Sequence, residues 1–109
     1  MKILVVCAAG ASSTFVAQRL RSAADAAGMP WTAVASTEAA LAADAQGADL
    51  VLLGPHLAAR AEDLRALVAA RGAQLEVLAE DIFTDLSGLR TLQLVRTIFG
   101  HSAPAKGTP

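Results

Sequence analysis

The stretch Val5-Val6-Cys7-Ala8-Ala9-Gly10-Ala11-Ser12-Ser13-Thr14 decides how this chain is organised. Residues 2–7 form a short apolar run that ends at the chain's single cysteine. Residues 13–27, which begin within the stretch and continue beyond it, repeat apolar side chains at helical spacing. The pattern therefore predicts a strand buried on both faces, then a tight loop, then a helix, with a thiol where the loop begins.

A loop of this kind brings several backbone N–H groups and the positive end of a helix dipole to one place, where they can bind an oxyanion. The same field favours a thiolate, so we expect Cys7 to have a lowered pKa and to act as a nucleophile. Gly10 allows a ligand to approach the backbone closely. The three hydroxyls at residues 12–14 can bind phosphate or cap the helix. A lone cysteine is more often a small buried hydrophobe, but these features together favour a functional loop.

The rest of the chain alternates between strand and helix patterns. We expect strands at residues 2–7, 31–35, 49–53 and 75–78, and helices at 13–27, from 36 or 37 to 47, at 57–71, and from 85 or 87 to 100. This alternation predicts a single α/β domain over residues 1–101, with a four-stranded parallel sheet and helices on both faces. Residues 102–109 have no apolar content to bury and are expected to form a flexible tail.

The composition argues against several classes of function. Nine basic and ten acidic residues leave no broad charge for binding nucleic acid or anionic lipid. The chain has no apolar run of membrane-spanning length and begins with a strand pattern, so we expect no signal peptide and no direct membrane insertion. One cysteine excludes an internal disulfide and fits a reducing cytosol. We expect no metal and no nucleotide, because neither ligand spacing nor a Walker-type loop is present.

Two segments carry a resemblance to a known family. Cys7-Ala8-Ala9-Gly10-Ala11-Ser12-Ser13-Thr14 resembles the phosphocysteine loop of the IIB component of the sugar phosphotransferase system (PTS), lactose/cellobiose type, which reads Cys-(Ser/Ala)-Ala-Gly-Met-Ser-Thr-Ser. Val51-Leu52-Leu53-Gly54-Pro55-His56 is similar to the family's Leu-Leu-Gly-Pro-Gln segment. Ala11 replaces Met, and His56 replaces Gln. The resemblance extends from residue 2 to about residue 100.

The resemblance implies a fold similar to low-molecular-weight tyrosine phosphatases, with strand order 2-1-3-4. In that order Cys7 and Gly54-Pro55-His56 face each other across one crevice. It also implies a cytoplasmic phosphotransferase in which Cys7 is catalytic and Ala8, Ala9, Gly10, Ala11, Ser12, Ser13 and Thr14 bind the phosphoryl group. Cys7 would accept this group from a phosphohistidine of the IIA protein. It would pass the group to a sugar, such as a β-linked disaccharide, in the membrane permease IIC. No cofactor is needed, because the energy arrives with the phosphoryl group.

The residues leave two other functions open. Low-molecular-weight tyrosine phosphatases and related arsenate reductases also place a cysteine in a loop after the first strand. The phosphatase loop needs an arginine six residues after the cysteine, where this chain has Ser13, and no Asp-Pro pair supplies a general acid. An arsenate reductase needs a resolving cysteine, which the chain lacks. The second alternative is a non-catalytic regulatory domain of the same fold.

Other polar residues carry weaker indications. His56 could donate a hydrogen bond to a phosphoryl group on Cys7, or it could be a solvated loop residue. Asp81 and Asp85 lie on a loop that could reach the crevice edge, although acids on loops are usually solvated or cap helices. A solvated helix face is expected for four charged residues, Arg60, Glu62, Asp63 and Arg65.

Overall fold

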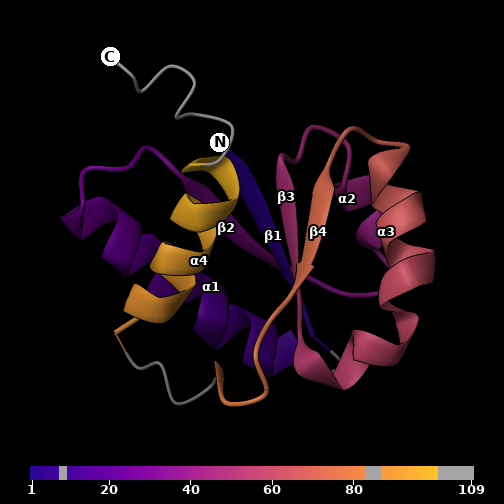
Figure 1. Cartoon of the computed structure of the whole chain (residues 1–109), viewed down its shortest axis with the longest axis horizontal. Coiled ribbons are helices and arrows are strands. Elements are labelled where there is room, and N and C mark those ends of the chain that lie inside the picture. The colour runs from indigo at the N-terminus through magenta and orange to yellow at the C-terminus, as the bar shows by residue number, and fades with distance from the viewer. Residues whose placement is uncertain (8–9, 83–86, 101–109) are drawn as a thin grey trace.

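The computed structural model describes residues 1–7, 10–82 and 87–100 of the 109-residue chain. Four parallel strands form one sheet in the order β2-β1-β3-β4 (Figure 1). Their bounds are Lys2–Val6 for β1, Thr32–Ser36 for β2, Leu50–Leu53 for β3 and Gln74–Val77 for β4. The α/β class and the strand order 2-1-3-4 are therefore confirmed.

Strand β1 occupies the centre of the sheet because its side chains are apolar on both faces. It pairs with β2 on one side and with β3 on the other, so that Ile3 lies beside both Ala33 and Leu50. Ile3 and Val5 enter one core cluster, whereas Leu4 and Val6 enter the other. A strand covered on both faces needs no alternation of polar and apolar residues, which explains its continuous apolar run.

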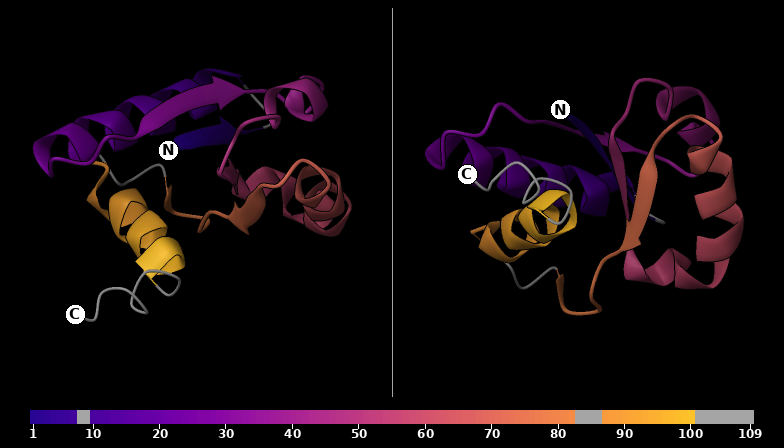
Figure 2. Two further views of the ribbon diagram at one scale, coloured as in Figure 1. Left: turned by 90° about the horizontal axis from the view of Figure 1, so that it is seen from above. Right: turned by 45° about the horizontal axis from the view of Figure 1, so that its top comes forward.

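Helices cover both faces of the sheet, as predicted. Helices α1 (Gly10–Ala26) and α4 (Leu89–Gly100) lie on one face, while α2 (Leu41–Asp44), the 3-10 helix η1 (Pro55–Arg60) and α3 (Ala61–Ala69) lie on the other (Figures 1 and 2). The first pair is packed closely. A Cβ at Gly88, which precedes α4 and has φ 78°, would collide with the backbone carbonyl of Arg19 in α1.

The observed boundaries differ from the predicted ones mainly at helix starts. Helix α1 begins at Gly10 rather than Ser13, so the three hydroxyls lie within its first turns instead of preceding it. The helix predicted over 57–71 is divided into η1 and α3. Pro55 occupies the first position of η1, where its fixed φ and missing N–H suit a helix start. Most strand ends lie one residue away from their predicted positions.

The two other predicted helices are shorter in the structure than the sequence indicated. The helix predicted between 36 and 47 has α geometry only over Leu41–Asp44. The Thr37 hydroxyl accepts a hydrogen bond from the Ala40 N–H at 3.1 Å and closes the turn before it. Helix α4 ends at Gly100 as predicted, and the Ser87 hydroxyl accepts a hydrogen bond from the Leu89 N–H at its start. Asp85 and the predicted tail, 102–109, lie outside the described residues.

Within the described ranges, no helix combines the length and apolar character that crossing a bilayer requires.

Candidate active site

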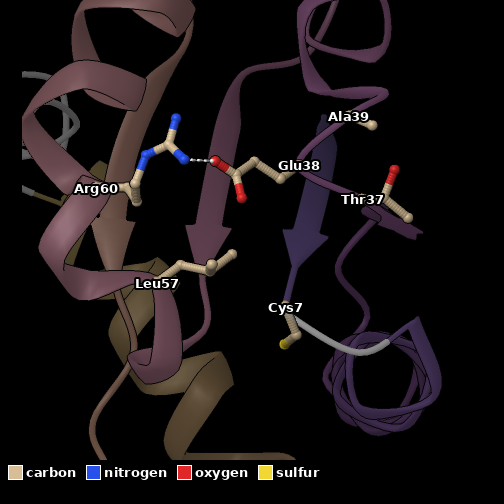
Figure 3. A pocket seen from close by; sticks show the side chains of 6 residues that line it. All are labelled: Cys7, Thr37, Glu38, Ala39, Leu57 and Arg60. Carbon is tan, nitrogen blue, oxygen red and sulfur yellow. Dashed lines mark ion pairs between the residues drawn. The ribbon is translucent and has the colours of Figure 1, made fainter.

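Cys7 directly follows the last residue of β1, at the carboxyl edge of the sheet. Its side chain is 2% exposed and belongs to the core cluster beneath α1 and α4. An open pocket of about 590 Å³ nevertheless reaches it (Figure 3). The other lining residues follow β2 (Thr37, Glu38 and Ala39) or belong to η1 (Leu57 and Arg60). Parallel strands end at one edge, so the segments after β1, β2 and β3 meet around the thiol.

Gly54, at the end of β3, lies against Cys7. A Cβ at Gly54 would come within 2.9 Å of the Cys7 Sγ and within 3.2 Å of its Cα and Cβ. The Gly54 N–H also donates a 2.7 Å hydrogen bond to the Val6 carbonyl, which joins the two strand ends. Gly54 has φ −61° and ψ 150°, an ordinary extended conformation, so glycine is required here for space and not for backbone freedom.

Pro55 and His56 do not share the pocket of Cys7. Together with Glu80 they line a separate hollow, and the His56 side chain is exposed. Of the second-loop residues singled out in the sequence, the structure therefore brings Gly54 into contact with the thiol. His56 lies on the outward side of the same loop.

An ion pair that the sequence patterns did not indicate lines the Cys7 pocket. The Arg60 guanidinium contacts the Glu38 carboxylate at 2.7 Å, with the side chains 56% and 32% exposed (Figure 3). Arg60 is exposed, as predicted, but it also bonds across to the segment after β2. A signal was present in the strand order, because residues that follow β2 and β3 must flank the end of β1.

Burial raises the pKa of the Cys7 thiol from 9.0 to about 11. The prediction of a lowered pKa was therefore wrong. Desolvation disfavours the thiolate at the end of this buried strand. Among the described residues that line the pocket, the only cation is Arg60, and it already contacts Glu38. Cys7 consequently carries its proton at neutral pH.

Comparison with known proteins gives these observations a family context. The family model for the PTS system, Lactose/Cellobiose specific IIB subunit, matches residues 2–83. The chain belongs to this family. As a IIB subunit it is a component of the sugar phosphotransferase system, a transferase that acts in sugar transport.

Two solved structures resemble this IIB subunit. The lactose-specific IIB component domain of Streptococcus pneumoniae has a TM-score of 0.78 and 21% identity, over 87% of this chain and 93% of that chain. The cellobiose-specific IIB component of Borrelia burgdorferi has a TM-score of 0.71 and 28% identity, over 93% of each chain. No curated protein sequence matches the chain. The first structure shares the fold, and the second extends that agreement over nearly the whole length.

The residues of the predicted phosphoryl-binding loop do not all lie in one place in the structure of this IIB subunit. Ala8 and Ala9 lie outside the described residues, and Gly10, Ala11 and Ser12 form the start of α1. The first backbone N–H groups of an α-helix have no acceptor within the helix, a feature that favours anion binding at helix starts in general. Ser13 is buried and Thr14 is exposed, and both line a smaller hollow beside the end of β2 rather than the Cys7 pocket.

The predictions for the remaining charged residues are largely supported. Asp81 is exposed and accepts a 2.8 Å hydrogen bond from Arg90 of α4, and this contact lowers the pKa of the Asp81 carboxyl. Arg65 pairs with Glu62 on the surface of α3. The described residues include no group of three or more His, Cys, Asp and Glu side chains placed to hold a metal ion.

Proposed function

We propose that Cys7 is the phosphoryl acceptor of this IIB subunit. It takes the phosphoryl group from a phosphohistidine of IIA and passes it to a sugar during transport through IIC. The observation that carries the proposal is the position of the chain's only thiol at the end of the central strand, on an open pocket, in a chain that belongs to the IIB family. A β-linked disaccharide is the proposed sugar, since the two similar structures are named lactose-specific and cellobiose-specific.

In the first step the P–N bond of the phosphohistidine breaks as a P–S bond forms to Cys7. At neutral pH the Cys7 thiol still holds its proton, and the departing imidazole nitrogen needs one. The proton passes from sulfur to nitrogen, and no net charge is created. Backbone N–H groups of residues 8–13 bind the phosphoryl oxygens, helped by the hydroxyl of Ser12, Ser13 or Thr14.

In the second step a sugar hydroxyl attacks phosphorus and the P–S bond breaks. The sulfur leaves as a thiolate, and at neutral pH it takes up a proton equivalent to the one that the sugar hydroxyl releases. This chemistry takes place at the inner face of the membrane, where we place the cytoplasmic IIB subunit through its contact with IIC.

A carrier must keep its phosphocysteine long enough to donate it. Ser13 stands where a tyrosine phosphatase has the arginine that clamps the phosphoryl group, and the chain has no Asp-Pro pair to supply an acid and a base for hydrolysis. Both differences favour a slowly hydrolysed phosphocysteine, and hence transfer over hydrolysis.

The test is phosphorylation by a IIA protein from the same genome that has been shown to carry phosphohistidine. Intact-protein mass spectrometry should find one phosphoryl group on the wild type, at Cys7, and none on Cys7→Ala. Cys7→Ser should give no onward transfer, because an alkoxide neither attacks nor leaves readily at neutral pH. An unlabelled wild type that repeatedly hydrolyses an aryl phosphate would replace the proposal with a phosphatase. A wild type that does neither would make the chain a regulatory domain.

A further inference from the structure

The Arg60–Glu38 ion pair joins two segments that are far apart in the sequence, and both partners line the pocket of Cys7. A second pair, Arg65–Glu62, has the same 2.7 Å contact but is confined to neighbouring turns of α3. Neither of its residues is among those described as lining the Cys7 pocket. The two pairs thus differ in their position relative to the thiol and provide a matched comparison.

Phosphorylation would change the charge balance of this pocket sharply. Before it, the pocket is lined by a protonated thiol and by an ion pair with no net charge. A phosphoryl group brings about −1.5 to −2 charges at neutral pH. Two anions, the phosphoryl group and the Glu38 carboxylate, then share the single cation among the described lining residues. Arg60 is the group that can resolve this repulsion.

The Arg60 side chain suits that role. It is 56% exposed, so its guanidinium can turn away from Glu38 without opening the core. A guanidinium has five N–H donors in a planar fork, which bind phosphoryl oxygens in pairs and can contact a carboxylate at the same time. An exposed ion pair contributes little net stability, so giving up the contact with Glu38 costs little.

We propose that Arg60 is a phosphoryl ligand of the phosphorylated state and that Glu38 is the counter-anion that holds it while Cys7 is free. The inference rests on the proposed function of Cys7. Arg60 stabilises the phosphocysteine dianion, Glu38 opposes it, and the pair together sets how readily the phosphoryl group leaves.

The experiment compares phosphorylated wild type with Arg60→Gln, Glu38→Gln and the control Arg65→Gln. A ³¹P NMR titration gives the second pKa of the phosphocysteine. Removing a contacting cation should raise this pKa by about 0.5–1 unit in Arg60→Gln, and removing the competing anion should lower it in Glu38→Gln. Arg65→Gln should leave it unchanged. Arg60→Lys, which keeps the charge but not the fork, should fall between wild type and Arg60→Gln.

The equilibrium of phosphoryl exchange with IIA is an independent readout, since it does not depend on how the two proteins dock. It should shift toward phosphorylated IIA by about 3- to 10-fold in Arg60→Gln and not in Arg65→Gln. Equal behaviour of these two variants, with Cys7 labelled in both, would overturn the role of Arg60 and leave the proposed function standing. A wild type that never acquires phosphocysteine would overturn both.

Discussion

Gly54→Ala is the substitution that most directly probes the packing around the thiol. The added Cβ would lie 2.9 Å from the Cys7 Sγ, whereas ordinary contacts between heavy atoms of this kind begin at about 3.5 Å. The backbone of Gly54, at φ −61° and ψ 150°, accepts alanine without strain. Any effect must therefore arise from the contact with Cys7, which has to move or push β1 and β3 apart.

The expected loss of stability is about 1–3 kcal/mol, the usual cost of placing one extra methyl group in a packed site. For a domain of this size it corresponds to a fall of about 5–15 °C in the unfolding midpoint. A sulfur displaced by several tenths of an ångström is also misaligned for in-line attack on phosphorus. We expect the rate of phosphoryl acceptance to fall about 10- to 100-fold.

A double-mutant cycle measured by thermal and urea unfolding checks the cause. Cys7→Ala removes the Sγ, the nearest atom to the new Cβ, so Gly54→Ala should cost clearly less stability in that background than in the wild type. The same cost in both backgrounds would show that the sulfur is not the obstacle. A Gly54→Ala protein with wild-type stability and wild-type labelling would refute the contact altogether.

Four further outcomes are expected. Alkylation of Cys7 by iodoacetamide should accelerate about tenfold per pH unit toward a midpoint near 11, because only the thiolate reacts. The folded pKa of about 11 exceeds the ordinary 9.0, so the thiol's contribution to stability is complete below pH 9 and is lost as the pH rises to 11; urea unfolding of wild type against Cys7→Ala should show this fall. Gly88→Ala should lower the stability of the fold by about 3 kcal/mol or more, and hence by more than Gly54→Ala does, because the positive φ of Gly88 and the rigid Arg19 carbonyl both oppose a Cβ. A thermal midpoint above that of Gly54→Ala would contradict this. His56→Ala and His56→Gln should both label at Cys7 within about twofold of the wild type, because the exposed His56 lines another hollow; a loss confined to Ala would instead assign His56 a hydrogen bond at the site.

The fold could be predicted from the sequence because local patterns and global packing agree. The apolar run of β1 indicates a strand covered on both faces, and the alternation of strands and helices restricts the connections to a parallel sheet. The type of helix was harder to predict from the sequence. An apolar stripe over 57–71 indicates a helix but does not distinguish the 3-10 geometry of Pro55–Arg60 from the α geometry that follows.

The place of Cys7 at the end of β1 could be predicted from the sequence, but the electrostatics of its surroundings could not. A cysteine before small residues and hydroxyls indicates an anion-binding loop, yet the pKa of the thiol depends on how much water reaches it, and no motif encodes that. The pair of Arg60 and Glu38 is likewise invisible to any local window, because only the strand order brings its partners together. Gly54 was found through its place after β3, although the close approach to Cys7 appears only in three dimensions.

The position of β1 also has a consequence for the way the protein is made. This strand is synthesised before its neighbours in the sheet, β2 and β3, which end at Ser36 and Leu53. Until both have been synthesised, Cys7 has no sheet around it and behaves as an ordinary exposed thiol. The thiol is thus most open to oxidation in the nascent chain, and this interval ends only when β3 and Gly54 have folded against β1. Slower translation across residues 7–54 would lengthen the exposure, whereas in the finished molecule Cys7 is only 2% exposed.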